Sequence, residues 1–304
     1  MNDFKKKEII KIITKREKLR SLNRIKRLVV DPIRALPFYF LAAASHIKPF
    51  EITFDTLWGT KMTSYLPEGN TFYYYGFCEA NLTNFLLRFL KHSDTFVDVG
   101  AHIGFYSMLA SEIVGENGKI YSFEPTPRTF KTLKENTKKL KNVHLFNIAL
   151  SNKEGRIDFS DYGPGYGAYN SGHPNGAALL NKKPRKITVE TKTLDSILKL
   201  ENISPNIIKL DAEGLEYKIL QGMSNTLSKT NRPIITLEVA GDRQWKNNYD
   251  NSIKLLLEND YKVFEINTVG LIKPHKIKQI YKYDNILFIP TEKTNALKYL
   301  YANN

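Results

Sequence analysis

Short apolar runs alternate with amphipathic segments through most of this 304-residue chain. The runs are rich in β-branched and aromatic residues, as strands are, whereas the segments between them repeat apolar residues at helical spacing. Strands are predicted at 95–99, 119–123, 143–147, 206–211, 233–239, 261–266 and 284–289, and helices at 81–91, 104–114, 127–140, 214–222 and 248–258. This alternation predicts an α/β fold with a doubly wound, mostly parallel sheet that has helices on both faces.

The regions outside this alternation are harder to assign. Residues 51–65 and 71–75 look like short strands, the first with a hairpin around Gly59, and the stretch after residue 147 is irregular. Long helices before residue 75 are expected to be broken at Pro32, Pro37 and Pro49. We divide the chain into a basic N-terminal helical segment 1–47, lead-in strands and a helix at 48–92, a main domain 93–290 with an insertion near 158–186, and a C-terminal tail 291–304.

A glycine turn follows the strand at 95–99. Asp98, Gly100 and Gly104 form the pattern Asp-x-Gly-x-x-x-Gly, and an apolar helix begins at once. A dinucleotide site uses G-x-G-x-x-G, whose middle glycine lets the backbone approach a pyrophosphate, so this spacing favours a ligand without one. Glu124, at the tip of the next strand, is placed to accept hydrogen bonds from ribose hydroxyls. These features predict a site for a nucleoside-containing cofactor, and the alternative is a turn that only connects strand to helix.

S-adenosylmethionine fits this pattern. The ribose of its adenosine can hydrogen-bond to Glu124, and its positive charges can pair with Asp98. Its carboxylate can accept hydrogen bonds from the amides of the turn at the helix N-terminus. In a doubly wound sheet, ligands bind beyond the carboxyl ends of the strands. That rule gathers the polar strand ends Asp98, Glu124, Asn147, Asp211 and Glu238 at one edge.

Charge is concentrated at the N-terminus. The chain has a net charge of +14, and residues 1–30 hold seven lysines and four arginines against three acidic residues. Apolar residues recur there at roughly helical spacing, at Ile9, Ile12, Leu19, Leu22, Ile25 and Val29. One interpretation is an amphipathic helix on an anionic membrane surface, and the other is a solvated, partly disordered basic arm. Nucleic acid is not expected, because no basic groove studded with aromatic residues follows.

The composition indicates the cellular compartment that we expect for the protein. Cys78 is the single cysteine, which excludes an internal disulfide and a cysteine metal cluster and suits a reducing cytoplasm. No run of about 18 uncharged apolar residues is present, so no spanning helix is predicted. We therefore expect a cytoplasmic protein, peripheral at the inner membrane face if the basic segment binds lipid.

Several motifs in order resemble a known family. The segments 97–107 and 123–125 resemble the first two motifs of class I methyltransferases. Residues 147–151 with Gly155, 193–197 and 208–216 narrow the resemblance to the FkbM family of S-adenosylmethionine-dependent O-methyltransferases, from about residue 75 to 240. The resemblance implies a Rossmann-like seven-stranded sheet, mostly parallel with an antiparallel last strand. It also implies methyl transfer to a hydroxyl, often on a sugar or a polyketide, and we expect a saccharide of a surface glycan or glycolipid.

The resemblance also implies where the cofactor lies. His102 departs from the family, which usually has Asn at this position. By motif position the cofactor-binding residues are Glu79, Asp98, Gly100, His102, Ile103, Gly104, Glu124, Pro125, Asn147, Ile148 and Ala149.

The acceptor side is predicted from the chemistry of the strand ends. Asp211 is expected to orient the acceptor hydroxyl or take its proton, with Lys209 on the same strand face supporting it and Glu213 nearby. The alternative for Asp211 is a cap on the helix near Gly214. Paired carboxylates with metal-ligand spacing are missing from the sequence, so no metal is expected.

The segment 162–176 is rich in glycine, tyrosine and proline, which suits either a lid over a sugar or a long disordered insertion. Candidate substrate contacts are His173, Tyr166, Tyr169 and Glu238. Two other function classes stay open. An NAD-dependent oxidoreductase is disfavoured by the missing middle glycine, and a non-catalytic membrane-surface protein with a cofactor-binding fold is the second alternative.

Overall fold

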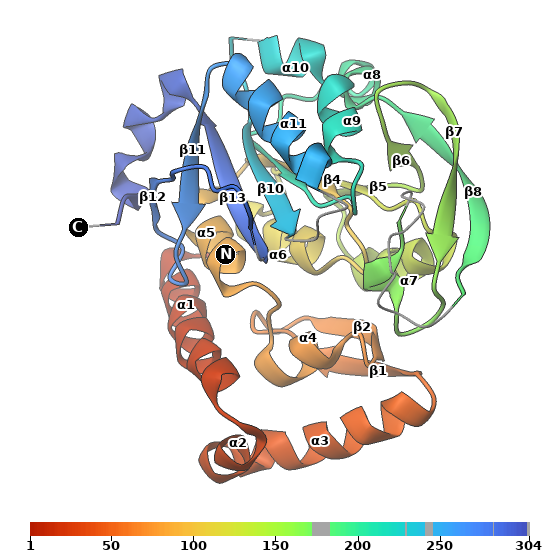
Figure 1. The fold of residues 1–304 in the computed structure, drawn as a ribbon. Coiled ribbons are helices and arrows are strands. Elements are labelled where there is room, and N and C mark those ends of the chain that lie inside the picture. Colours follow the sequence, from red (N-terminus) through yellow and green to blue (C-terminus); the bar gives the residue numbers. More distant parts are fainter. Residues whose placement is uncertain (172–182, 229, 241–245, 282, 303–304) are drawn as a thin grey trace.

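A computed structural model describes residues 1–302 except 172–182, 229, 241–245 and 282. Its centre is an eight-stranded sheet with the order β12-β11-β13-β10-β9-β3-β4-β5 (Figure 1). The strands are β3 (Thr95–Val99), β4 (Lys119–Phe123), β5 (Val143–Phe146), β9 (Ile207–Leu210), β10 (Ile234–Ala240), β11 (Tyr261–Ile266), β12 (Ile272–Pro274) and β13 (Tyr283–Pro290). β13 runs antiparallel to both of its neighbours, β10 and β11. The predicted Rossmann-like sheet with an antiparallel last strand is confirmed, and β12 adds an eighth strand.

Helices cover both faces of this sheet. They are α5 (Ala80–Phe89), α6 (Phe105–Val114), α7 (Pro127–Thr137), α8 (Leu194–Leu200), α9 (Glu216–Gln221), α10 (Ser224–Ser228) and α11 (Lys246–Glu258). Successive strand residues point to opposite faces, so Phe96 joins the core under α5 and α6, while Val97 joins the core under α9 and α11. The central strands are apolar on both faces because both faces are covered.

Two local predictions need correction. Residues 71–75 were expected as a strand, but they lie in helix α4 (Asn70–Tyr75), which ends at Gly76 with a φ of +84°. Their aromatic side chains favour strands in general, but here Tyr74 and Tyr75 pack into the core from one helical turn. The stretch after residue 147 is partly regular and forms a three-stranded sheet of β6 (Ala149–Leu150), β8 (Arg185–Lys192) and β7 (Gly155–Asp161). The predicted insertion near 158–186 is largely the connection between β7 and β8, which includes the short helix η2 (Gly167–Tyr169).

The N-terminal segment is helical throughout. Its elements are α1 (Asp3–Glu17), η1 (Lys18–Ser21), α2 (Arg24–Val30) and α3 (Pro32–Ile47). Helix α1 packs against α5 and buries Ile9 and Ile13, whereas Ile25 and Val29 on α2 are exposed. The apolar stripe seen in the sequence is therefore divided between the protein core and the surface.

Pro37 does not break α3, contrary to expectation. Proline removes one helical hydrogen bond, the one to the carbonyl of Ile33, and both residues are exposed, so water can satisfy that carbonyl. Pro32 begins the helix, where its missing N–H costs nothing.

The remaining elements frame the carboxyl ends of the parallel strands. The predicted hairpin around Gly59 is confirmed as β1 (Phe50–Asp55) and β2 (Lys61–Leu66). In Figure 1 this hairpin and α4 lie at the end toward which β10 points, and α3 lies beyond them. The C-terminal segment forms η3 (Thr291–Lys293) and η4 (Asn295–Leu300), with Leu297 and Leu300 buried. Within the described part of the chain, the helices are all too short or too polar to span a bilayer.

Candidate active site

A cavity of about 390 Å³ lies at the carboxyl ends of the parallel strands. The β3–α6 turn and the ends of β4, β9 and β10 form its walls, together with α4 and the loop around η2. Twelve of the predicted site residues line it: Glu79, Gly100, His102, Glu124, Pro125, Ile148, Ala149, Tyr169, Lys209, Asp211, Glu213 and Glu238. The fold therefore brings predicted cofactor and acceptor residues into one space.

The glycine turn is shaped by close backbone packing. Gly100 has a φ of +73°, and its N–H donates to the carbonyl of Phe123 at 3.0 Å. A Cβ atom at Gly100 would overlap the carbonyl oxygen of Asp211 on the neighbouring strand. Gly104 has a φ of +95°, and a Cβ there would lie 2.6 Å from Leu133. Both positions require glycine for conformation and for space.

Glu124 is fixed at the end of β4. Its carboxylate accepts the backbone N–H groups of His102 at 3.1 Å and Thr126 at 2.9 Å. Burial raises the pKa of Glu124 above its ordinary value, although His102 and these hydrogen bonds oppose the shift. The side-chain hydroxyl of Thr126 also hydrogen-bonds to this carboxylate, and its remaining lone-pair capacity can accept a ligand hydroxyl. Asn147 does not line the cavity but holds this segment from behind, because its amide donates to the carbonyls of Glu124 and Pro125 at 2.8 and 3.0 Å.

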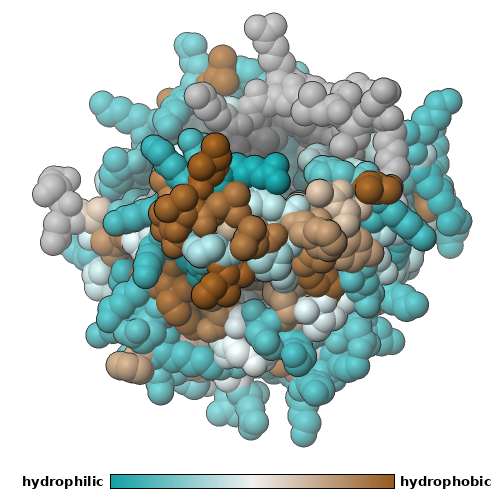
Figure 2. Space-filling view, turned by 90° about the horizontal axis from the view of Figure 1, so that it is seen from below, coloured by the Kyte–Doolittle hydropathy of each residue, from teal (hydrophilic) through white to brown (hydrophobic). Residues whose placement is uncertain are grey.

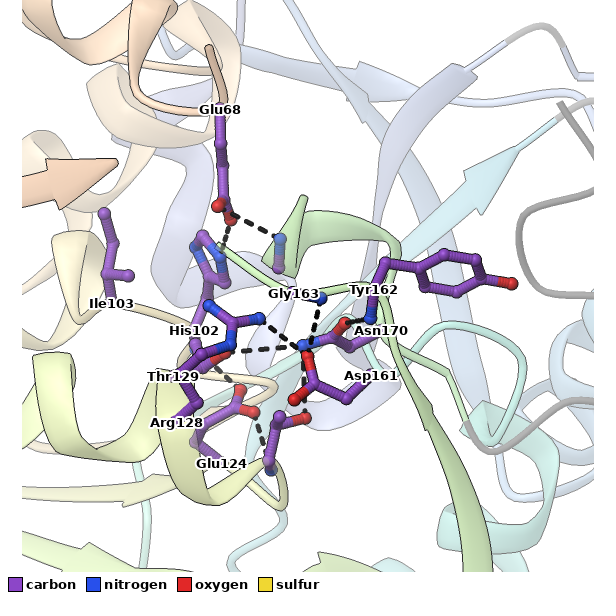
Figure 3. A network of polar contacts seen from close by, with 12 residues as sticks. Glu68, His102, Ile103, Glu124, Arg128, Thr129, Asp161, Tyr162, Gly163 and Asn170 are labelled. Carbon is purple, nitrogen blue, oxygen red and sulfur yellow. Dashed lines mark hydrogen bonds and ion pairs between the residues drawn. The ribbon is translucent and has the colours of Figure 1, made fainter. Parts of the chain in front are cut away.

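An ion pair links the turn to the N-terminal hairpin (Figure 3). His102 pairs with Glu68, which follows β2, and Glu68 also accepts the N–H of Gly167 at 3.0 Å. Burial alone lowers the pKa of His102, but Glu68 outweighs it and raises the pKa, so His102 keeps its proton to higher pH than a free imidazole. Glu68 is not predicted from the sequence, because an acidic residue in a turn far from the glycine motif carries no local signal.

A second set of contacts in Figure 3 holds the segment after β7. Arg128 pairs with Asp161 at 2.7 Å, and Asp161 accepts the N–H of Gly163 at 2.9 Å. Asn170 accepts the N–H of Tyr162 at 2.9 Å, and its amide donates to the hydroxyls of Thr126 and Thr129, at 3.4 Å each.

These contacts give an ordered wall for the described part of the predicted lid. Tyr169 lines the cavity and Tyr166 does not. His173 lies outside the described residues.

Lys209 is the buried cation of the site. Its ammonium lies 2.9 Å from Asp211, 3.7 Å from Asp98 and 3.4 Å from the carbonyl oxygen of Gly100. Burial alone lowers the pKa of Lys209, but Asp211 and Asp98 outweigh it and raise the pKa. Asp98 itself is fully buried, accepts a hydrogen bond from Ser107 at 2.6 Å, and does not line the cavity. It supports Lys209 and α6 from behind, and Ile103 and Gly104 also lie outside the lining.

Three carboxyl groups meet beside Lys209. Oxygen atoms of Asp211, Glu213 and Glu238 all lie within 4.8 Å of one another. Burial raises the pKa of Asp211, but Lys209 and a hydrogen bond with Glu238 outweigh it and lower the pKa. Burial and the charge of Asp211 raise the pKa values of Glu213 and Glu238 well above normal. Within the cluster Asp211 therefore loses its proton at the lowest pH, and Glu213 and Glu238 keep theirs to higher pH than free carboxyl groups do.

The capping alternative for Asp211 is wrong. Helix α9 begins at Glu216 with Leu215 as its N-cap residue, so Asp211 lies outside the helix. Glu216 provides the hydrogen-bond acceptor for the backbone of this turn. Its carboxylate accepts the N–H groups of Ala212 at 2.8 Å and Gly214 at 3.1 Å. Asp211 is thereby left facing the cavity.

Glu79 lines the cavity close to the carboxyl cluster, because its partner Asn285 is the cross-strand neighbour of Glu238. Its carboxylate accepts the hydroxyl of Tyr106 at 2.6 Å and an amide hydrogen of Asn285. These partners come from α6 and β13, so the residue is fixed from both sides. The cavity thus holds Glu124, the proposed ribose contact, in one part and the carboxyl cluster around Asp211 in another.

Comparison with known proteins supports this assignment of the fold. Residues 98–263 match the Methyltransferase FkbM domain. The chain is 28% identical over 166 residues to the hexuronic acid methyltransferase AglP of Haloferax volcanii, covering 54% of this chain and 64% of that protein. It is 32% identical over 125 residues to the 2-O-methyltransferase NoeI of Sinorhizobium fredii, covering 37% of this chain and 50% of that protein. The matches therefore span less than two thirds of these relatives.

A solved structure is also similar. The Methyltransferase FkbM from Methylobacillus flagellatus aligns with a TM-score of 0.45 and 15% identity, covering 87% of this chain and 61% of that chain.

Proposed function

The chain belongs to the FkbM family of methyltransferases, and we propose that it moves a methyl group from S-adenosylmethionine to a hydroxyl of a saccharide. The observation that carries the proposal is the single cavity that joins Glu124 to the cluster around Asp211. The two relatives named above, one a hexuronic acid methyltransferase and the other a 2-O-methyltransferase, support a sugar hydroxyl as the acceptor.

The residues present fit this cofactor. A side chain at Gly100 would overlap Asp211, so the turn presents bare backbone to the cavity. Glu124 has lone-pair capacity left for a ribose hydroxyl, and Ile148 and Ala149 supply an apolar wall for adenine. S-adenosylmethionine, when bound, supplies a methyl group on a positively charged sulfur that departs as a neutral thioether.

Asp211 acts on the acceptor in this proposal. As the ionised member of the cluster, it accepts a hydrogen bond from the acceptor hydroxyl and takes the proton while the oxygen–methyl bond forms. Lys209 keeps Asp211 ionised and oriented before the reaction. Glu238 donates a hydrogen bond to Asp211 and helps to hold its carboxylate in place until that proton arrives. General-base assistance of this kind contributes about 10²–10⁴-fold, and alignment of the reactants contributes further.

The test uses labelled S-adenosylmethionine with hexuronic acid oligosaccharides and with neutral oligosaccharides. We expect label in a saccharide fraction for the wild type and a loss of about 10²–10⁴-fold for Asp211→Asn. Binding of S-adenosylhomocysteine by calorimetry should be nearly unchanged in that variant. Wild-type turnover by Asp211→Asn would exclude the base role, and binding of NADH instead of S-adenosylhomocysteine would favour the oxidoreductase alternative. Binding of neither ligand would favour the non-catalytic alternative.

A further inference from the structure

A row of exposed apolar side chains runs along α2 and α3. We call it the α2–α3 ridge, and its members are between 62% and 90% exposed: Ile25, Val29, Val30, Ile33, Leu36, Phe40 and Ile47. Figure 2 views the molecule from the side on which these helices lie and shows hydrophobic side chains gathered there. Contiguous exposed apolar surface is uncommon on proteins that have no partner for it.

On α3 the ridge forms one face of the helix, and the opposite face packs against the rest of the protein. Ile33, Phe40 and Ile47 recur every seven residues, so they lie along one side of α3. On the other side, Ala35 is buried, and the ring of Phe38 lies 4.7 Å from that of Tyr74 on α4. The inner face therefore anchors α3 to the protein. The outer face stays exposed in the described structure and can bind a partner.

The charges beside the ridge identify the partner. Between residues 18 and 48 the chain has seven lysines and arginines and one acidic residue, Asp31. Asp31 is paired with Arg34 at 2.6 Å and Glu17 with Arg20 at 3.1 Å, so five of the seven cations have no carboxylate partner among the described residues. Arg24, Lys26 and Lys48 are exposed next to ridge residues. An apolar stripe with cationic neighbours matches a surface of acyl chains below anionic headgroups.

We propose that the α2–α3 ridge docks the protein on an anionic lipid bilayer, with both helices lying in the plane of the interface. This places lipid contact at residues 24–48 rather than on α1, whose apolar face is taken by the protein core. In Figure 1, α3 lies on the same side of the main sheet as the carboxyl ends of its parallel strands. Docking therefore turns the cavity side of the molecule toward the membrane, where a lipid-linked saccharide would be held. That last consequence rests on the proposed function, whereas the docking does not.

The test is sedimentation with vesicles of phosphatidylcholine, with and without phosphatidylglycerol. We expect the wild type to bind the mixed vesicles and Ile33→Ser/Phe40→Ser to bind about tenfold more weakly. The matched control is Leu200→Ser/Leu257→Ser, which removes exposed leucines from α8 and α11 and should bind like the wild type. Lys26→Glu/Lys48→Glu should lose the dependence on phosphatidylglycerol, and added salt should weaken wild-type binding.

Each result is decisive. Thermal unfolding midpoints equal to that of the wild type show that the variants are folded, as expected for substitutions at exposed positions. Failure of the wild type to bind mixed vesicles would overturn the proposal, and so would equal binding by Ile33→Ser/Phe40→Ser. A dimer in solution that this variant abolishes, without vesicle binding, would assign the ridge to a second copy of the chain. A wild type that binds the vesicles but transfers no methyl group would count against the proposed function and leave the docking proposal intact.

Discussion

The backbone of Gly100 lies so close to Asp211 that a Cβ atom on the glycine would overlap the carbonyl oxygen of the aspartate. This contact joins the cofactor turn at the end of β3 to the proposed acceptor-binding residue at the end of β9. The two halves of the site cannot move apart independently, because β3 and β9 are hydrogen-bonded neighbours.

Gly100→Ala should therefore disturb both halves. The strain of a positive φ costs about 1–2 kcal/mol for a residue with a Cβ, and the backbone overlap adds to it. Gly59→Ala is the matched control, because Gly59 also has a positive φ but has no atom within 4 Å of its Cβ position. We expect a larger drop in the unfolding midpoint for Gly100→Ala and loss of S-adenosylhomocysteine binding only there. Equal effects of the two substitutions would contradict the close packing.

Lys209→Met removes the buried cation. Asp98 and Asp211 then lack their partner, and breaking a buried ion pair costs about 3–5 kcal/mol. In the wild type the lowered pKa of Asp211 stabilises the fold above its ordinary pKa, and this stability is lost as the pH falls through the lowered value. The variant should raise the pKa of Asp211, so the acid limb of kcat/KM should move to higher pH. Lys218→Met on α9 removes an exposed lysine and should change neither quantity.

The raised pKa of Glu238 makes the stability of the fold depend on pH in the opposite direction to the lowered pKa of Asp211. Its pKa is raised in the folded state, so the native protein holds a proton that the unfolded chain releases above the ordinary value of 4.5. Stability should therefore fall as the pH rises from 4.5 toward the raised pKa. Glu238→Gln keeps the shape without the ionisation and should flatten this decline in unfolding midpoints between pH 5 and 8. Glu201→Gln, an exposed carboxyl, should leave the wild-type decline in place, and an unchanged decline in Glu238→Gln would refute the assignment.

Glu68 and His102 should act as a unit. The raised pKa of His102 stabilises the fold fully below its ordinary value of 6.5, and this stability is lost as the pH rises through the raised pKa. Glu68→Gln, His102→Asn and the double variant form a cycle whose coupling free energy of unfolding should be about 0.5–3 kcal/mol below that pKa. The coupling should shrink as the pH rises. Additive effects at every pH would show that the two side chains do not stabilise each other.

Chelators should not affect methyl transfer. Oxygen atoms of Asp211, Glu213 and Glu238 are close enough to bind a divalent cation, a cluster that the sequence does not predict. However, Lys209 already neutralises Asp211, and the raised pKa values of Glu213 and Glu238 oppose the loss of protons that metal binding requires. We expect equal turnover with EDTA and with added Mg²⁺. Loss of turnover in EDTA with recovery in Mg²⁺ would instead assign a metal to this cluster.

Much of the site follows from local sequence, because its conformation is local. Gly100 and Gly104 could be assigned from spacing, since a tight turn between strand and helix requires positive φ values. Glu124 followed from its position at the next strand end. Glu68 could not be found in this way, because its partner His102 is distant in sequence and the two meet only after the hairpin packs on the turn.

The misassigned elements have a similar cause. Residues 71–75 have side chains that suit strands, and only their packing against α3 and α6 favours a helical turn. In α1 and α2 the helical period shows which side chains share a face. It does not show whether the core or the solvent meets that face, and the structure assigns α1 to the core and the ridge to the surface.

The sequence by itself determined the alternation of strands and helices in the main sheet, the backbone conformation of the glycine turn and the family, because these depend on local backbone preference and on motif spacing. Asp211 and Glu238 could be assigned to one sheet edge from the sequence, but only the tertiary structure decided their spacing and the opposite directions of their pKa shifts, because pKa values depend on burial and on neighbours from other strands. It also decided that Asp98 supports Lys209 from behind the cavity. The exposure of the α2–α3 ridge was settled there too, since amphipathic spacing defines a helix face but not what covers it.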